Sequence, residues 1–410
     1  MSLNSLYSIL DDLTSTLCMR PLFAGQKSRQ RLTINNTEYR IVDRLGEGGF
    51  SHVLLGETPQ KTHYAIKKMV CHRGTDALAM ARREIAAYGK FKHPNIIRMV
   101  DHSIIHDGGE DGERATVYMV FPLYRQGTLL DAVRHSQDTG RPLDEDALVR
   151  LFLGVCEAVR HMHEFGEEDA GAACHRGEED AGAACHRGEE DAGAACHRGE
   201  EDAGTACHWG DAAAATACHR GEEDAGTACH WGDAAAATAC HRGDAEPNNS
   251  SGYAHRDIKL ANIMLSDDGT TPVLMDFGSV ARARLTVRDR SEALRVQDDA
   301  AEQCSMPYRA PELFDVQRGC SLDERTDVWS LGCLLFALAW GHTPFEHPLA
   351  GGGGPGASIA LAAINANYAV PRDSIYSGRI ARLVAFMLEP DAAKRPFVRD
   401  VAELARKLYH

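Results

Sequence analysis

The chain has 410 residues, a formal net charge of −15 and 44% hydrophobic residues, which is enough apolar material for one large or two ordinary cores. Its longest apolar runs are much shorter than the roughly 20 residues of a membrane-spanning helix, no secretory leader opens the sequence, and the acidic balance argues against a nucleic-acid partner. We therefore expect a soluble, cytoplasmic, globular protein without a transmembrane segment, in which the 13 cysteines are reduced thiols rather than a disulfide framework.

The first 32 residues form an N-terminal extension in which leucines recur at spacings of three and four residues. That spacing predicts a helix with one apolar edge, which would lie on a membrane, dock a partner or pack against the rest of the chain. The residues of this edge are Leu3, Leu6, Leu10, Leu13 and Leu17. Residue 2 is Ser2, which cannot accept an N-terminal myristate, whereas Cys18 is a candidate for palmitoylation.

Short segments rich in β-branched and aromatic residues follow the extension and are separated by turn residues. They are Tyr39 to Gly46, His52 to Thr58, His63 to Val70 and Thr116 to Phe121. An amphipathic helix is predicted from Asp144 to Phe165, with Asp144 as its N-cap and Gly166 as its terminator. Helical patterns return from Thr326 to the C-terminus, interrupted by the glycine-rich run Gly351 to Gly356. A sheet-rich part therefore precedes a helix-rich part, which indicates the α+β class.

An eleven-residue unit, GEEDAGAACHR, repeats seven times from Gly166 to Arg242 and drifts to GEEDAGTACHW and GDAAAATACHR. Three copies carry a charge of −2, two carry −3 and two are neutral, so the tract holds 12 of the 15 net negative charges. A helix through the copies would align their Cys-His pairs on one stripe, but the glycines and the lack of large apolar residues oppose a packed helix. We expect a disordered or loosely helical low-complexity insert, and a metal-binding tract or a gene-prediction artefact are the alternatives.

The insert, residues 166–251, interrupts the connection between the predicted helix that ends near Phe165 and a predicted strand at Tyr253. Closing a loop costs about 0.6 kcal/mol for each doubling of its length, so lengthening a short connection to about 85 residues costs on the order of 2.5 kcal/mol. A domain of this size tolerates that cost. We therefore expect the fold and its activity to survive the insert.

The segment LGEGGFSHV, from Leu45 to Val53, lies between two predicted strands, where its glycines would let backbone amides close over phosphates. On its own this segment is equally well an ordinary β-turn. The next strand carries Lys67 in YAIK, and the helical stretch after it carries Glu84 in RREI. An isolated Lys-Glu pair is usually a solvated surface pair, but this order is required for a lysine that a carboxylate holds against the α- and β-phosphates of a nucleotide.

The motif HRDIKLAN after the insert supplies three groups for phosphoryl transfer. Asp257 would orient or deprotonate a hydroxyl, Lys259 would neutralise the migrating phosphoryl group, and Asn262 offers an amide oxygen to Mg²⁺. The DFG triplet that follows adds Asp276 as a second metal ligand. Each acid alone is more often a loop residue, but the glycine-rich loop, Lys, Glu, HRD-K-N, DFG and APE in this order predict a phosphotransferase.

At these residues the chain resembles the eukaryotic protein kinase family, over nearly everything from about Thr33 to Leu408 apart from the repeats. The resemblance implies a bilobal fold with a small β-rich N-lobe and a larger helical C-lobe, and ATP and Mg²⁺ as cofactors. The lysine two residues after Asp257, and Ser305 in CSMPYRAPE, are similar to the serine/threonine branch, in which Ser305 would lie near Asp257.

The family resemblance also implies structural supports and a site. The supports are an ion pair between Glu312 and Arg395 and an Asp327 that braces the catalytic loop. Catalysis is assigned by resemblance to Asp257, Lys259, Lys67 and Glu84, and the metal to Asn262 and Asp276. The residues that it implies for nucleotide binding are Leu45, Gly46, Glu47, Gly48, Gly49, Phe50, Ser51, Val53, Ala65, Lys67, Phe121, Leu123, Asn262 and Asp276.

More narrowly, LGEGGFS, HPNI, GTLLD, GYAHRD, VLMDFGS, SEALRVQDDAAEQCSMPYRAPEL and DERTDVWSLGC resemble the Numb-associated kinase family. In that family a small residue such as Ser51 commonly replaces the third loop glycine, so this departure does not indicate a dead enzyme. Alignment on GTLL places Phe121 at the back of the adenine pocket and Pro122 to Tyr124 in the hinge. The resemblance further implies a peripheral association with Golgi or other trafficking membranes, although the lipid anchor of relatives is missing at Ser2.

The stretch from Asp276 to Glu312 is long for an activation segment, and Ser291 to Gln303 is predicted to be a helix. In this subfamily such a helix packs near the substrate groove, and a solvated surface helix is the alternative. Arg256 would pair with a phosphate added to this segment, with Ser291 and Ser305 as candidate acceptors.

The sequence thus predicts a serine/threonine protein kinase that uses ATP and Mg²⁺, phosphorylates proteins and itself, and acts in membrane trafficking or Golgi-linked signalling. A kinase-fold scaffold whose Cys-His insert recruits partners or metal is the alternative. The expected domains are an N-terminal extension (1–32), an N-lobe (33–122), a C-lobe (123–165 and 252–408) and the repeat insert (166–251).

Overall fold

The computed structural model describes residues 30–47, 51–72, 75–107, 114–166, 252–346 and 359–409. The chain divides into two compact units, residues 1–175 with 249–410 and residues 176–248, and all described residues belong to the first. The predicted N-terminal helix, the Cys-His repeats, the tip of the glycine-rich loop and the run Gly351 to Gly356 lie outside the described residues.

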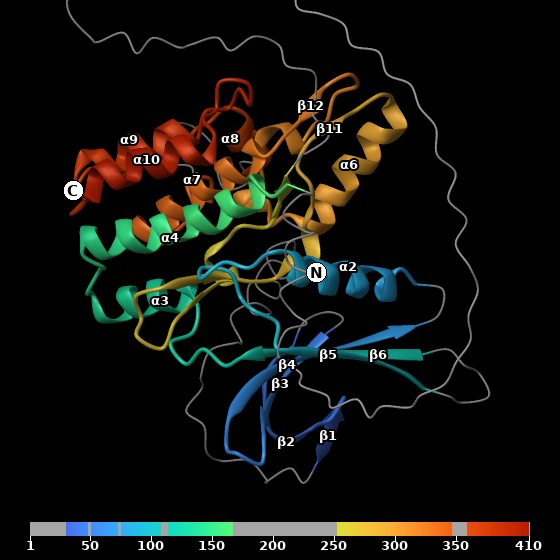
Figure 1. Ribbon diagram of the computed structural model, residues 1–410. Helices are drawn as coiled ribbons and strands as arrows, with labels where there is room; N and C mark the ends of the chain where they lie inside the picture. The colour runs from blue at the N-terminus through green and yellow to red at the C-terminus, as the bar shows by residue number, and fades with distance from the viewer. Residues whose placement is uncertain are drawn as a thin grey trace, which may run out of the picture. The chain divides into compact units, whose positions relative to one another are not determined.

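A six-stranded antiparallel sheet forms the N-terminal part of the described structure (Figure 1). In spatial order its strands are β1 (Arg31–Ile34), β2 (Thr37–Glu47), β3 (Ser51–Glu57), β4 (His63–His72), β6 (Arg114–Pro122) and β5 (Asp101–Asp107). The predicted strands are confirmed, and β1 and β5 are additions to them. The expected N-lobe boundary at residue 33 falls inside β1.

Strand β6 is buried along most of its length because both faces of the sheet are covered there. Alternate residues Val117 and Met119 pack toward helix α2 (Ala77–Lys90), whereas Tyr118 and Val120 pack into a smaller cluster on the other face. This two-sided burial explains why β6 reads as a nearly continuous apolar run rather than as an alternating strand.

The C-terminal part is mainly helical and is connected to the sheet through the segment after β6 (Figure 1). Its helices are α3 (Leu129–Thr139), α4 (Glu145–His163), α6 (Arg290–Gln303), α7 (Arg325–Trp340), α8 (Ile359–Ile364), α9 (Gly378–Met387) and α10 (Val398–Tyr409). Three two-stranded ladders lie among them: β7 (Tyr253–Ala254) with β10 (Ala281–Arg282), β8 (Ile263–Leu265) with β9 (Pro272–Leu274), and β11 (Leu285–Thr286) with β12 (Ser321–Leu322). The α+β class and the order of a small β-rich part before a larger helical part are confirmed.

Helix α7 forms the centre of this core, since thirteen of its residues from Thr326 to Leu338 are buried. Helix α4 packs beside it and begins as predicted, because the Asp144 carboxylate accepts a hydrogen bond from the Ala147 amide at 2.8 Å. The prediction that Gly166 terminates this helix is wrong. Helix α4 ends at His163, because Phe165 leaves the helical path and packs with its ring centroid 5.2 Å from that of Phe91.

The two ends of the insert are held together by packing. The ring centroids of Phe165 and Tyr253 lie 6.1 Å apart, and Phe91 packs against both rings. A Cβ added at Gly252 would fall 1.8 Å from the carbonyl oxygen of His163, so only glycine permits this close approach. The folded unit therefore closes on itself at residues 166 and 252, where the insert leaves and returns.

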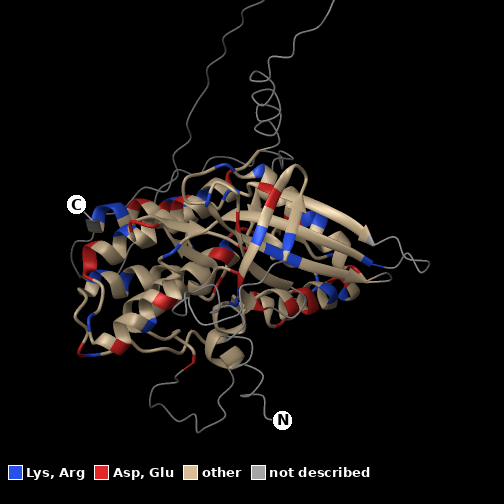
Figure 2. Ribbon diagram, turned by 90° about the horizontal axis from the view of Figure 1, so that it is seen from below, with Lys and Arg blue, Asp and Glu red and all other residues tan. Residues whose placement is uncertain are grey.

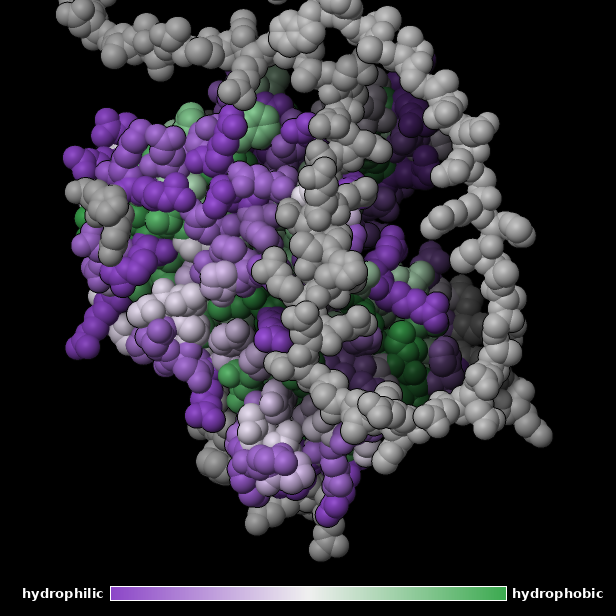
Figure 3. Space-filling view, viewed as in Figure 1, coloured by the Kyte–Doolittle hydropathy of each residue, from purple (hydrophilic) through white to green (hydrophobic). Residues whose placement is uncertain are grey.

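Charges of both signs are mixed over the helices, and basic residues recur on the strands of the sheet (Figure 2). The face shown in Figure 3 is mainly hydrophilic over the C-terminal helices. Within the part of the chain that the structure describes, none of the helices combines the length and the apolar character that crossing a bilayer requires.

Candidate active site

Lys67 and Glu84 meet because α2 lays one face on the sheet. The buried residues of α2 are Ala81, Glu84, Ala87 and Tyr88, at spacings that place them on one side of the helix. Glu84 is only 3% exposed, and its Oε1 accepts a hydrogen bond from the Lys67 Nζ of β4 at 2.7 Å. The alternative of a solvated surface pair is therefore wrong.

Asp276 completes this cluster from the helical part of the protein. Its Oδ1 lies 3.4 Å from the Lys67 Nζ, and its backbone adopts a left-handed conformation with φ of 64°. Burial alone would lower the pKa of Lys67, but Asp276 and Glu84 raise it well above its ordinary value. Lys67 in turn holds the pKa of Asp276 below its ordinary value against the effect of burial. The cluster thus keeps a charged ammonium next to an ionised carboxylate at neutral pH.

Aromatic packing positions Asp276 from behind. The next residue, Phe277, is 1% exposed, and its ring centroid lies 4.9 Å from Tyr88 of α2 and 5.5 Å from His255. Tyr88 also donates its hydroxyl to Glu84 Oε1 at 3.3 Å. These edge-to-face and tilted ring contacts therefore hold the carboxylates of both Glu84 and Asp276 relative to the sheet.

Asp257, Lys259 and Asn262 converge in a second cluster. Asp257 Oδ2 lies 3.0 Å from the Lys259 Nζ and accepts a hydrogen bond from the Asn262 Nδ2 at 3.0 Å. The same Nδ2 donates to the carbonyl of Asp257 at 2.8 Å. The carboxylate of Asp257 is thus fixed by groups that lie within five residues of it in the chain.

Ser305 lies beside Asp257, as the serine/threonine branch implies. Its backbone N–H donates to Asp257 Oδ1 at 3.0 Å, and its hydroxyl accepts a hydrogen bond from the Lys259 Nζ at 2.8 Å. Residues of the activation segment and of the catalytic loop are therefore joined directly at the carboxylate.

Asp327 braces the catalytic loop from the start of α7. Its Oδ2 accepts hydrogen bonds from the His255 amide at 2.7 Å and the His163 imidazole at 2.9 Å, and its Oδ1 accepts one from the Arg256 amide at 2.8 Å. Arg256 is held with a left-handed φ of 67°. Burial opposes ionisation of Asp327, but His163 and the other donors lower its pKa below the ordinary value.

The implied pair of Glu312 and Arg395 is bidentate, with distances of 2.7 and 2.9 Å. Arg395 is fully buried, and its guanidinium lies 5.1 Å from the centre of the Trp329 ring. Its remaining donors reach the carbonyls of Glu389 and Arg325. Each nitrogen of this buried guanidinium therefore donates at least one hydrogen bond, as a structural ion pair requires.

The expected nucleotide-binding residues come from the sheet and the segment after it. Ala65 of β4 lies opposite Phe121 of β6, and both are 7% exposed. Phe121 contacts Tyr88 at a centroid distance of 4.9 Å. At the base of the glycine-rich hairpin Gly46 pairs with Val53. The further expected residues that the structure describes here are Leu45, Glu47, Ser51 and Leu123, whereas Gly48, Gly49 and Phe50 lie outside its description.

Asn262 and Asp276 offer side-chain oxygen atoms that suit a divalent metal ion. The Met275 amide donates to the backbone carbonyl of Asn262 at 2.9 Å, which ties the two loops together. Because the side-chain nitrogen of Asn262 is engaged with Asp257, its amide oxygen remains as the donor atom. An amide oxygen and an ionised carboxylate oxygen are ligands that Mg²⁺ prefers. Among the described residues no cluster of three or more His, Cys, Asp or Glu suits a metal, and the Cys-His repeats lie outside them.

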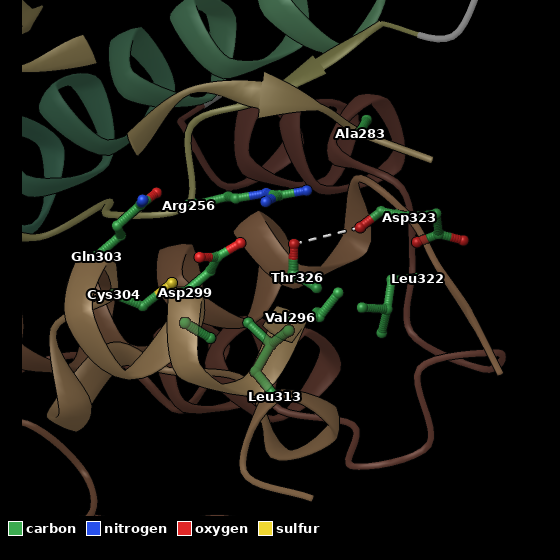
Figure 4. Close-up of a pocket in the computed structure, with 11 residues that line it drawn as sticks. Arg256, Ala283, Val296, Asp299, Gln303, Cys304, Leu313, Leu322, Asp323 and Thr326 are labelled. Atoms are coloured by element: carbon green, nitrogen blue, oxygen red, sulfur yellow. Dashed lines mark hydrogen bonds between the residues drawn. The ribbon is translucent and has the colours of Figure 1, made fainter. Parts of the chain in front are cut away.

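Arg256 points toward a small pocket of about 20 Å³ between α6 and the start of α7 (Figure 4). Asp299 and Cys304 line the same pocket, and the Thr326 hydroxyl bonds to the Asp323 carbonyl there. The Arg256 Nη2 also donates to the carbonyl of Arg282 at 3.1 Å. Burial raises the pKa of the Cys304 thiol to about 12, so this cysteine is not a reactive thiolate.

Two residues of the site were missed in the sequence. His163 contacts Asp327 from the last turn of α4, and Tyr88 links Glu84 to Phe277. Tyr88 follows Glu84 by four residues, a helical spacing that offered a signal. The partner of His163 lies 164 residues further along the chain, and no local pattern indicates such a contact.

Comparison with known proteins agrees with this geometry. The protein kinase domain family matches residues 39–174 and 249–405. The chain is 31% identical over 372 residues to serine/threonine-protein kinase 16 of Rattus norvegicus and, separately, to that of Homo sapiens, which covers 90% of this chain and 90% of each relative. It is 38% identical over 385 residues to a probable serine/threonine-protein kinase of Dictyostelium discoideum, covering 92% of this chain and 95% of the relative.

Proposed function

The chain belongs to the protein kinase family and is a serine/threonine kinase. We propose that Lys67, Asp257 and Asp276 are the main residues that transfer the ATP γ-phosphoryl group to protein hydroxyls. The observation that carries this assignment is the position of the Lys67 Nζ, 2.7 Å from Glu84 of α2 and 3.4 Å from Asp276. Elements far apart in sequence thus meet around one ammonium group.

Lys67 is proposed to hold the α- and β-phosphates. Its raised pKa keeps the ammonium charged, and Glu84 restrains the side chain in one orientation. A lysine restrained in this way loses little conformational freedom when the nucleotide binds. Glu84 therefore acts through Lys67, as a positioning residue.

Asp257 is proposed to orient the acceptor hydroxyl and to take its proton. The carboxylate is held by the Ser305 amide, Asn262 and Lys259, so it approaches the hydroxyl from a fixed direction. Lys259 lies 3.0 Å from the same carboxylate, where its charge offsets the charge that develops on the migrating phosphoryl group.

Asn262 and Asp276 are the residues that would hold Mg²⁺, which neutralises charge on the β- and γ-phosphates when it is bound. The pKa of Asp276 is lowered by Lys67, so the carboxylate is available as a ligand across the neutral range. The proposal for these two residues is supported by their oxygen chemistry and by the hydrogen bond that links their loops.

Transfer of labelled γ-phosphate from ATP to dephosphorylated casein tests the assignment. We expect Asp257→Asn to lower kcat by about 10²- to 10⁴-fold, the usual contribution of a positioned base. Asp315→Asn changes an exposed carboxylate of the same helical part and serves as the matched control. Equal rates for the wild type and Asp257→Asn would contradict the proposed role of Asp257.

Autophosphorylation is proposed as a second reaction of the same site. The exposed Ser291 near the start of α6 supports it, because an exposed hydroxyl at a helix N-terminus accommodates a phosphate. Incubation with ATP followed by peptide mass mapping tests it. Phosphate incorporation that persists in Asp257→Asn would show that another kinase in the preparation is responsible.

A peripheral role at trafficking or Golgi membranes is proposed from the leucine edge of residues 3–17 and from the resemblance to the Numb-associated kinases. Flotation with phosphatidylcholine and phosphatidylserine vesicles measures the association directly. Leu10→Glu should abolish flotation without lowering casein phosphorylation, because one buried charge opposes insertion of an apolar edge. Flotation that is unchanged by Leu10→Glu would exclude this edge as the anchor.

A further inference from the structure

A groove of about 640 Å³ runs along the outside of the connection between the two parts of the fold. We call it the hinge groove. Its walls come from the turn before β4, the residues before β5, the segment Pro122 to Arg125 and the turn between β8 and β9. Its volume lies within the range of ligand-binding sites. None of the catalytic residues proposed above lines it, and it shares only Leu123 with the expected nucleotide site.

The charge of the hinge groove is positive. Lys61, Arg98 and Arg125 line it, and Asp267 is its one carboxylate. Lys61 lies 3.4 Å from Glu57 and is 74% exposed, so that pair is weak. The Arg125 amide donates to Asp267 Oδ1 at 2.9 Å. The guanidinium groups of Arg98 and Arg125 form no ion pair with any residue that the structure describes.

Much of the remaining lining of the groove is apolar. Val100 is 48% exposed, and Leu123, Pro122 and the ring of Tyr64 are half-buried beside it. A free phosphate or a nucleic-acid backbone would satisfy the cations but leave Val100 and Leu123 in water. An extended peptide with a bulky aliphatic side chain flanked by acidic residues matches both properties, because its carboxylates reach the arginines while the aliphatic group covers the valine.

We propose that the hinge groove is a docking site for an acidic segment of a protein substrate, centred on Arg98, Arg125 and Val100. The assignment of the partner as a substrate rests on the proposed kinase function, whereas the binding itself does not. A segment held at the groove would raise the local concentration of a distant acceptor hydroxyl near Asp257.

Fluorescence anisotropy on the full chain tests the binding without nucleotide. The probe is a fluorescein-labelled peptide in which single leucines are flanked by glutamates, and a peptide with glutamine in place of glutamate is its control. Arg98→Ala/Arg125→Ala should weaken binding about tenfold, and added salt should weaken binding to the wild type. Arg114→Ala is the matched control, because Arg114 lies at the opposite end of β6 from the groove. Both arginines of the double variant are exposed, so thermal melting should match that of the wild type.

Several outcomes overturn the docking proposal. These are a wild-type chain that does not bind the probe at low salt, equal binding of the glutamine peptide, and equal binding by the double variant. Displacement of the probe by pyrophosphate, with no loss when leucine is replaced by serine, would assign a small anion to the groove instead.

Steady-state kinetics then separate docking from catalysis. For a peptide that joins an acceptor serine to the acidic segment, the double variant should lower kcat/KM about tenfold through KM. A short acceptor peptide without the segment should be phosphorylated equally by both proteins. Equal losses on both peptides would show a structural defect and overturn the proposal. A chain that binds the probe but phosphorylates nothing would instead contradict the proposed kinase function.

Discussion

Replacement of Asp327 by asparagine tests whether one carboxylate holds the catalytic loop to α7. Its two oxygens accept three hydrogen bonds, from the amides of His255 and Arg256 and from the imidazole of His163. Asparagine keeps one oxygen and turns an NH₂ group toward at least one of these donors. The lost hydrogen bond to a buried charge costs about 1.5–3 kcal/mol, and the unsatisfied donor costs about 1–3 kcal/mol more. We expect the free energy of unfolding to fall by about 3–5 kcal/mol.

Urea unfolding followed by tryptophan fluorescence measures this change, because Trp329 and Trp340 belong to α7 itself. Asp315→Asn is the control. Its side chain is exposed, so we expect the free energy of unfolding to change by less than about 0.5 kcal/mol. Asp327→Asn should also lower kcat, because Asp327 anchors the left-handed residue directly before Asp257.

The pH dependence provides a second measurement of the same interaction. The folded state lowers the pKa of Asp327, so its stabilisation is complete above the unfolded value of about 3.9 and is lost as the pH falls through the folded value. The difference in free energy of unfolding between the wild type and Asp327→Asn should therefore shrink below about pH 4. A difference under about 1 kcal/mol at pH 7, or one that stays constant on acidification, would refute the proposed brace.

Further predictions concern the charge cluster, the activation segment and the insert. Lys67→Met should lower kcat/KM for ATP at least about 100-fold in a coupled ATPase or casein assay. Lys68→Met, one residue along β4, should have little effect. Similar losses in both variants would indicate general damage to the strand. Ser305→Asp places a carboxylate beside Asp257 and should lower kcat about tenfold or more through like-charge repulsion. Ser305→Thr should retain activity, and a fully active Ser305→Asp would contradict this geometry. Excision of residues 167–251 should preserve casein phosphorylation and raise stability by up to about 2.5 kcal/mol, because the chain ends are already held together; an inactive but folded product would show that the insert takes part in catalysis.

Local chemistry made much of the fold predictable. The N-cap of α4 was evident because an aspartate precedes an apolar helical period, and capping depends on neighbours within three residues. The strands around Lys67 were evident from their β-branched and aromatic residues. The order of Lys67, Glu84, Asp257 and Asp276 indicated phosphoryl transfer because each group has a separate chemical task in that reaction.

Other features depended on contacts that no local pattern contains. Helix α4 ends before Gly166 because Phe165 packs with Phe91, a residue from the other part of the fold. Strand β1 was missed because it is only four residues long, and its pairing with β2 defines it.

The order of the chemical groups, their identities and the class of reaction were determined by the sequence alone, because residue type and spacing suffice for them. Only the tertiary structure decided that His163 and Asp327 meet, that the Ser305 backbone amide donates to the Asp257 carboxylate, and that two arginines and an exposed valine line one groove. These contacts join residues separated by tens to more than a hundred positions. Their geometry follows from how the sheet, α2 and α7 pack together, and packing is a property of the whole chain rather than of any segment of it.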